Sequence, residues 1–153
     1  MDFKIYPEDV YRIQSYRKEL NFVDHATLER EDEMAENTGF LTTHILDTAN
    51  GCPAHGVRID LFRLDGDTRH HLSTVVTNDD GRTDSPVIEK GNLEEGVYEL
   101  VFAIGDYFAG TDERQGQPFI DIVPIRFGIS DADQHYHVPL LASPYSYSTY
   151  RGS

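Results

Sequence analysis

The chain has 153 residues and a formal net charge of −14, with 27 Asp and Glu residues against 13 Lys and Arg residues. A surface of that sign repels phosphate backbones and anionic lipid headgroups, so we expect binding to neither nucleic acid nor membrane. Nine Tyr, eight Phe and no Trp, with Gly and Pro at short intervals, are typical of one strand-rich domain.

Residues 1–39 differ in character from the rest, and we predict that they form an N-terminal extension. Apolar residues recur every three or four positions after Pro7, which is typical of an amphipathic helix, and an acidic linker (EREDEMAE, 29–36) follows. The segment lacks the apolar core of a signal peptide, so we expect a soluble, cytoplasmic protein. These residues indicate no chemistry. Docking of a partner through the acidic helix is the open alternative.

From residue 40 onward the pattern changes to short strands separated by turns. Turn-forming residues at 50–51, 65–67 and 78–81 separate the runs, and 105–115 reads as irregular or briefly helical. Within 56–64 the apolar residues alternate with polar ones, which places them on one face of a strand. The predicted strands are 41–48, 56–64, 71–77, 86–88, 96–104, 119–129, 136–142 and 145–150.

Some eight short strands with frequent turns predict an all-β fold of two packed sheets. Pro124 falls inside the 119–129 strand. Because proline cannot donate to a ladder, we expect that strand at an edge or a bulge. The predicted domain is therefore 40–153, a β-sandwich with a short helix, preceded by the helical extension.

Three stretches of the chain carry a resemblance to a known family. They read THILDTANGCPAHGVRIDLFRL (43–64), TNDDGRTDSP (77–86) and HYHVPLLASPYSYSTYRGS (135–153). They resemble the transthyretin-like family and, within it, its 5-hydroxyisourate hydrolase branch. The resemblance implies two four-stranded sheets with a short helix after the fifth strand. It also implies a homotetramer, a dimer of dimers around a central channel, with the active sites at the surface between dimers.

A few positions separate the hydrolases of this family from its hormone carriers. The carriers have Lys, Glu and Thr where this chain has His44, Arg82 and His137, and they lack the terminal YRGS. The resemblance therefore implies that His44, Arg82 and His137 are catalytic. It implies a substrate-binding role for the last four residues, Tyr150, Arg151, Gly152 and Ser153.

The implied reaction opens the ring of 5-hydroxyisourate, a planar oxidised purine, at an acyl–nitrogen bond. That step needs an activated water, a donor to the developing oxyanion and a proton for the departing nitrogen. Two histidines that titrate near neutral pH and one permanently charged arginine supply these functions without a metal or other cofactor. The residues do not indicate which histidine is the base, or whether other cyclic ureides are opened.

Other readings of the same residues remain in competition. His135 and His137 lie two apart and therefore on one face of a strand, where they are a possible metal pair, with the adjacent His70 and His71 as further nitrogen ligands. Cys52, the only cysteine, excludes an intramolecular disulfide, and we interpret it as a small packing residue rather than a nucleophile. The rival function is non-catalytic binding of a small molecule by a transthyretin-like channel.

Overall fold

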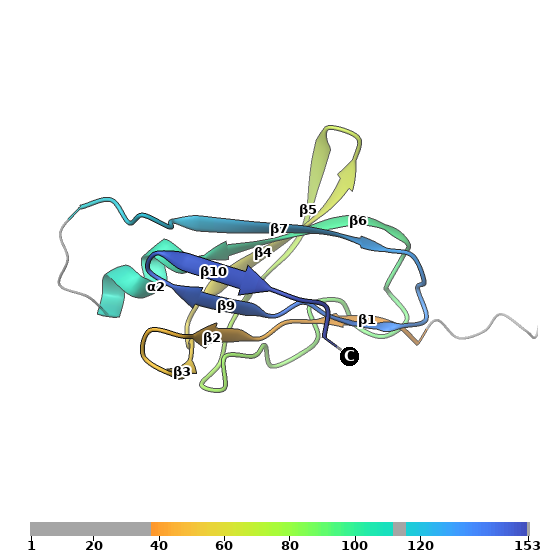
Figure 1. The fold of residues 1–153 in the computed structure, drawn as a ribbon. Helices are drawn as coiled ribbons and strands as arrows, with labels where there is room; N and C mark the ends of the chain where they lie inside the picture. Colours follow the sequence, from red (N-terminus) through yellow and green to blue (C-terminus); the bar gives the residue numbers. More distant parts are fainter. Residues whose placement is uncertain (1–37, 112–115, 153) are drawn as a thin grey trace, which may run out of the picture. The chain divides into compact units, whose positions relative to one another are not determined.

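The computed structural model describes residues 38–111 and 116–152. Within these residues the chain forms ten strands and one helix (Figure 1). The strands are β1 (Phe40–Thr42), β2 (Ile45–Asp47), β3 (Cys52–Pro53), β4 (Arg58–Asp65), β5 (Thr68–Val76), β6 (Gly96–Ala103), β7 (Ile122–Ile129), β8 (His135–His137), β9 (Leu140–Ser143) and β10 (Ser146–Thr149). The helix α2 (Ile104–Thr111) follows β6.

Two four-stranded sheets face each other as the layers of a sandwich, in the orders β5-β4-β6-β7 and β10-β9-β2-β3 (Figure 1). The first sheet is antiparallel throughout. In the second sheet β2 runs parallel to β9, and the short pair β1–β8 is also parallel. The fold class predicted from the sequence is therefore confirmed.

The core lies between the two layers and is built largely from side chains that alternate along the strands. On the first sheet Ile59 and Leu61 of β4 are at most 1% exposed, as the two-residue period predicted. On the second sheet Ile45 and Leu140 are fully buried and pair with each other across β2 and β9. Burial of such side chains supplies roughly 1.5–3 kcal/mol each, which holds the layers together.

The predicted strands 41–48 and 136–142 are each divided in two, at 43–44 and at 138–139. Their backbones still run side by side, because Val138 N donates to Thr42 O at 3.0 Å and Leu140 N donates to His44 O at 2.8 Å. The segment 86–88 forms only an isolated bridge, between Leu41 and Ile88. These divisions account for most of the difference between about eight predicted strands and the ten observed.

Two local predictions are confirmed in detail. Pro124 lies on β7, which is the edge strand of its sheet, so its missing N–H leaves no internal ladder bond unmade. The segment after β6 is helical for eight residues rather than irregular.

Among the described residues, no helix is long and apolar enough to cross a membrane. The extension predicted at 1–39 lies outside the described residues up to residue 37, and it stays a prediction.

Candidate active site

The site is built on the face of β1 and β8 that points away from the core. Leu41, Thr43 and Ile45 are buried, so the alternating residues Thr42 and His44 project from the opposite, outer face. β1 pairs with β8 in a parallel register that sets Thr42 opposite His137. His44 and His137 therefore share the outer face, although they are 93 positions apart in the sequence.

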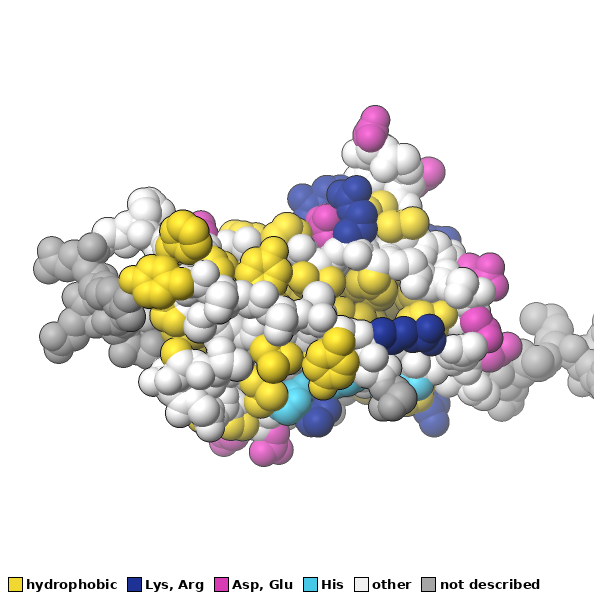
Figure 2. Space-filling view, in the orientation of Figure 1, with side chains coloured by type: hydrophobic (Ala, Val, Ile, Leu, Met, Phe, Trp, Pro, Cys, Tyr) yellow, Lys and Arg dark blue, Asp and Glu magenta, His cyan; other side chains and the backbone are white. Residues whose placement is uncertain are grey.

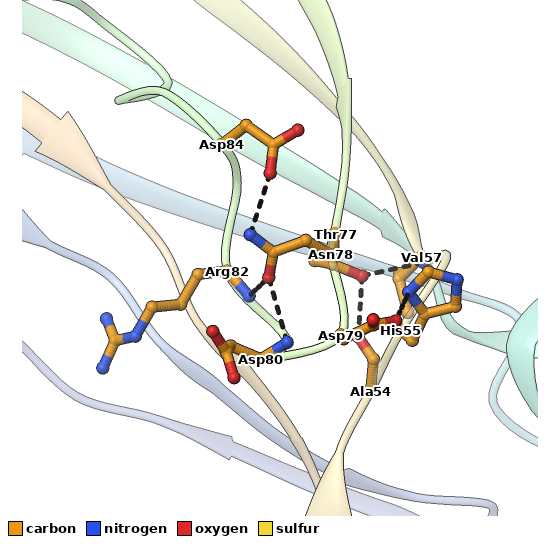
Figure 3. Close-up of polar contacts among 9 residues, drawn as sticks. All are labelled: Ala54, His55, Val57, Thr77, Asn78, Asp79, Asp80, Arg82 and Asp84. Atoms are coloured by element: carbon orange, nitrogen blue, oxygen red, sulfur yellow. Dashed lines mark hydrogen bonds and ion pairs between the residues drawn. The ribbon is translucent and has the colours of Figure 1, made fainter.

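Arg82 reaches this face from the turn that follows β5, and Asn78 organises that turn (Figure 3). The Asn78 Oδ1 accepts bonds from the backbone N–H groups of Asp80 (3.0 Å) and Arg82 (3.2 Å). Asn78 Nδ2 donates to Asp84 at 3.0 Å. In Figure 3 the Arg82 guanidinium extends away from these contacts.

Gly81 brings the turn against β2. Ile45 N donates to Gly81 O at 2.9 Å, and His44 and Arg82 form a backbone bridge. Gly81 has a φ of +71°, and a Cβ built on it would collide with the carbonyl oxygen of Ile45. Only glycine meets both demands. The turn sequence Asn-Asp-Asp-Gly therefore places Arg82 next to His44.

The C-terminal tail is turned back onto His137 where the sheet ladder stops. β9 and β10 pair as far as Leu140 and Thr149, and Pro139 has no N–H to continue the ladder. The tail leaves the sheet there, and Gly152 N donates to His137 O at 2.9 Å. A Cβ on Gly152 would lie 2.5 Å from Cδ2 of the His137 ring, so a side chain at this position would displace the imidazole.

The other tail residues surround the site less tightly. The Arg151 guanidinium stacks 4.7 Å from the centroid of the Tyr136 ring, and its Nη2 donates to Gln134 at 2.8 Å. Tyr150 is 58% exposed. Ser153 lies outside the described residues. Among the described tail residues, Gly152 is the one that bonds to a predicted catalytic residue, through the backbone oxygen of His137.

Electrostatics confirm that the three predicted catalytic groups lie within range of one another. Partial burial lowers the pKa of His137, and the positive charge of Arg82 and then the neighbouring His135 and His44 lower it further. Partial burial also lowers the pKa of His44, with Arg82 the second cause and a hydrogen bond to the Asp80 backbone opposing it. Both imidazoles are consequently neutral at pH 7 and able to accept a proton.

Two residues not assigned to catalysis from the sequence belong to this cluster. Thr42 Oγ1 lies 2.7 Å from Nε2 of His135 and 2.9 Å from Nδ1 of His137. His135 also stacks on Phe40, with ring centroids 4.0 Å apart. His135 appeared in the sequence only as half of a possible metal pair. The period-two spacing of 135 and 137 was the one signal available, and nothing marked Thr42.

The two other interpretations of nearby residues concern a metal site and Cys52. His70 and His71 lie on β5 in the other sheet, and the His71 Nε2 lies 3.0 Å from the Thr74 hydroxyl. No group of three or more His, Cys, Asp or Glu side chains suited to a metal occurs in the part of the chain that the structure describes. The interpretation of Cys52 as a packing residue is wrong, because Cys52 is exposed on β3.

The arrangement as a whole offers two neutral imidazoles, one guanidinium without an acidic partner among the described residues, and a tail that borders them. Figure 2 shows histidine side chains close to Lys and Arg side chains along the lower margin of that view. Neutral imidazoles accept and return protons, and the guanidinium binds carbonyl oxygens and stabilises an oxyanion. The chemistry that fits is addition of water to an electron-poor carbonyl group.

Comparisons with known proteins agree with this geometry. The family model described as the HIUase/Transthyretin family matches residues 41–152. The "5-hydroxyisourate hydrolase 2" of Rhizobium meliloti (strain 1021) is 61% identical over 117 residues, which cover 76% of this chain and 98% of that protein.

Two solved structures are also similar. A crystal structure of (S)-allantoin synthase matches with a TM-score of 0.71 and 52% identity, over 76% of this chain but 44% of that chain. The structure of Klebsiella pneumoniae 5-hydroxyisourate hydrolase matches with a TM-score of 0.62 and 36% identity, over 75% of this chain and 94% of that one.

Proposed function

The chain belongs to the HIUase/transthyretin family, and from that membership we propose that it hydrolyses 5-hydroxyisourate, with His44, Arg82 and His137 as its catalytic residues. The product is 2-oxo-4-hydroxy-4-carboxy-5-ureidoimidazoline, a step of urate degradation. One observation carries the residue assignment. The outer face of β1 and β8 gathers two histidines with lowered pKa values around a guanidinium without an acidic partner among the described residues.

The reaction follows from what each group can do. A neutral imidazole accepts a proton from water, and the resulting hydroxide adds to the ring carbonyl. Arg82 donates to the oxygen on which negative charge develops, where its permanent charge stabilises the transition state more than the ground state. The proton held on imidazole then passes to the departing ring nitrogen, so the acyl–nitrogen bond breaks without expelling an anion.

The tail completes the pocket in this proposal. Tyr150 and Arg151 border the substrate, and Gly152 keeps the space beside the His137 ring open. Ser153 is proposed to bind substrate or water. All four roles rest on the family resemblance together with the return of the tail to His137 through the Gly152 backbone bond.

We also infer that the protein works as a cytoplasmic homotetramer without a cofactor. β10 and β7 are edge strands of their sheets, and Tyr145 and Tyr147 are 62% and 48% exposed along the β10 edge. Exposed aromatic side chains on a sheet edge favour pairing with a second copy. Light scattering on the pure protein tests this assembly, and a monomer at working concentration contradicts it.

A coupled assay tests the activity. Urate oxidase generates 5-hydroxyisourate, and the decay of its ultraviolet absorbance is followed with and without the protein. We expect decay that is much faster than the spontaneous rate and unchanged by chelator. His44→Ala and His137→Ala should each lose about 10²- to 10⁴-fold in kcat/KM, the usual contribution of a general acid or base.

A matched variant separates chemistry from folding in this assay. His71→Ala removes an exposed histidine on the other sheet and should leave kcat/KM unchanged. Decay no faster than the spontaneous rate, from folded wild-type protein, contradicts the proposal. Non-catalytic binding of a small molecule would then become the leading function.

A further inference from the structure

The Thr42 hydroxyl lies between two imidazoles, and the proposed mechanism does not yet use it. We propose that Thr42 and His135 are positioning residues that set the tautomer of His137 and take up its proton during the reaction. This inference rests on the proposed function. It adds that one of the two histidines, His137, is the base, and that it acts as the outer end of a three-residue relay.

The sheet register aligns the relay. Phe40 pairs with His135 and Thr42 pairs with His137 in the parallel β1–β8 ladder. Residues two apart on a strand share a face, so the four side chains stand on one surface. The Thr42 hydroxyl reaches both rings, at 2.7 Å from His135 Nε2 and 2.9 Å from His137 Nδ1.

A hydroxyl carries one proton, so it donates to one of the two rings and accepts from the other. In the proposed arrangement Thr42 donates to His135 Nε2 and His137 Nδ1–H donates to Thr42, because the base must keep its Nε2 free for a proton from water. The second nitrogen of His137, Nε2, then carries no proton and has no partner among the described residues.

The proton inventory closes through this chain. Water gives a proton to His137 Nε2, His137 Nδ1 passes its proton to Thr42 Oγ1, and Thr42 passes its own to His135 Nε2. The net result is one hydroxide added to the substrate carbonyl and one proton stored on His135. When the acyl–nitrogen bond breaks, the three transfers run in reverse and His137 Nε2 protonates the leaving nitrogen.

Charge favours transfer away from His137. Arg82 and His44 both oppose a proton on His137. His135 lies two residues before His137 on β8, on the side away from His44, with its ring centroid 6.2 Å from that of His137. Stacking on Phe40 attracts a cationic imidazole, whereas Lys90 Nζ, 5.3 Å from the same Phe40 ring, opposes it. At His137, by contrast, the charge of Arg82 lowers the pKa more than any other charge does.

The variants Thr42→Val and Thr42→Ser test the hydroxyl, and His135→Phe tests the terminal imidazole while keeping an aromatic ring on Phe40. We expect kcat to fall about 10- to 100-fold in Thr42→Val and His135→Phe, the usual effect of removing a group that orients a reacting histidine. KM should stay unchanged, because neither group touches substrate. Thr42→Ser should retain the wild-type kcat.

Thr43→Val is the matched control. Thr43 is the adjacent residue, and its buried hydroxyl donates to Val138 O at 2.8 Å on the core side of the strand. Its loss should lower the melting temperature without lowering kcat. Equal losses of kcat in Thr42→Val and Thr43→Val would assign the Thr42 effect to strand stability and overturn the proposal.

The double variant Thr42→Val/His135→Phe separates a relay from two independent contacts. If the two residues act through one chain of protons, breaking both links lowers kcat no further than breaking one. The double variant should therefore have the kcat of the less active single variant. Multiplied effects overturn the relay. The rate in mixtures of H₂O and D₂O should report several protons in flight for the wild type and fewer in Thr42→Val.

A measurement without substrate keeps this inference separate from the proposed function. In wild-type protein labelled with ¹⁵N-histidine, long-range ¹H–¹⁵N spectra above the histidine pKa should show His137 protonated at Nδ1, and Thr42→Val should lose that preference. Wild-type His137 protonated at Nε2 overturns the relay. Wild-type protein without activity on 5-hydroxyisourate, but with the Nδ1 tautomer, contradicts the proposed function instead.

Discussion

Charged side chains are handled in opposite ways on the two sheets. On β5-β4-β6-β7 they pair across strands: Glu99, with its side chain 8% exposed, binds Arg69 at 2.5 Å and Arg126 at 3.2 Å. On the outer face of β1 and β8, no carboxylate of the described residues lies within ion-pair distance of Arg82 or the histidines. The charged groups of the first sheet are therefore paired with one another, whereas we propose that the cation of the second face binds a ligand.

The two surfaces also differ in what holds them in place. Cross-strand ion pairs fix the charged groups of the first sheet. The site groups are instead fixed by backbone hydrogen bonds and by close approaches of Gly81 and Gly152. A site built in this way can leave its cation unpaired without losing its geometry. The comparison therefore predicts that stability and activity separate on substitution.

The largest effect on stability is expected at the turn that carries Arg82. Gly81→Ala places a Cβ in a left-handed backbone conformation and against the Ile45 carbonyl, so we expect a loss of at least about 2 kcal/mol in unfolding free energy, together with loss of activity. Gly66→Ala is the matched control. Gly66 has a φ of +57° with nothing within 4 Å, so about 1 kcal/mol and normal activity are expected. Chemical denaturation measures both, and equal losses would contradict the close approach.

On the first sheet we expect a substitution to lower stability without lowering activity. Glu99→Gln leaves Arg69 and Arg126 without their shared carboxylate, and because both arginines are half exposed we expect a loss of only about 1–2 kcal/mol in unfolding free energy. Activity on 5-hydroxyisourate should not change. A fall in kcat/KM from folded Glu99→Gln protein would mean that the two surfaces are coupled.

Contact between the tail and the His137 ring should affect activity more than stability. Gly152→Ala sets a methyl group 2.5 Å from Cδ2 of the ring, so either the imidazole or the tail must move. We expect kcat/KM to fall about tenfold, which corresponds to about 1.4 kcal/mol in transition-state stabilisation. Gly128→Ala, on exposed β7 with nothing within 4 Å, should leave the rate unchanged. A normal rate in Gly152→Ala would remove the tail from the site.

The smallest effect is a shift along the pH axis. The pKa values of His44 and His137 are lowered from 6.5, so both rings are neutral above those values, and we expect activity to fall as pH drops through them. Arg82→Gln removes a positive charge that lowers both pKa values. The acid limb of kcat/KM against pH should therefore move to higher pH, while Arg69→Gln should not move it. Movement of the acid limb to lower pH would contradict the claim that the charge of Arg82 lowers the two histidine pKa values.

Local patterns in the sequence determined most of the fold. The alternation in 56–64 matches the buried face of β4, the Asn-Asp-Asp-Gly turn lies where its residues indicate, and Pro124 occupies an edge strand. Asp47 closes β2, with Oδ1 accepting from Ala49 N at 2.9 Å and Asn50 N at 3.0 Å. These features depend on residues only a few positions apart, so they can be predicted without the rest of the chain.

The set His44, Arg82 and His137 was named by resemblance and not by local pattern. The tertiary structure decided that the three lie on one outer face, where partial burial and then the charge of Arg82 lower both histidine pKa values. It also decided the contacts of Thr42, whose partners lie 93 and 95 residues away. Such contacts depend on which strands pair and in which register. That register follows from packing of the whole core, and no window of sequence around Thr42 contains it.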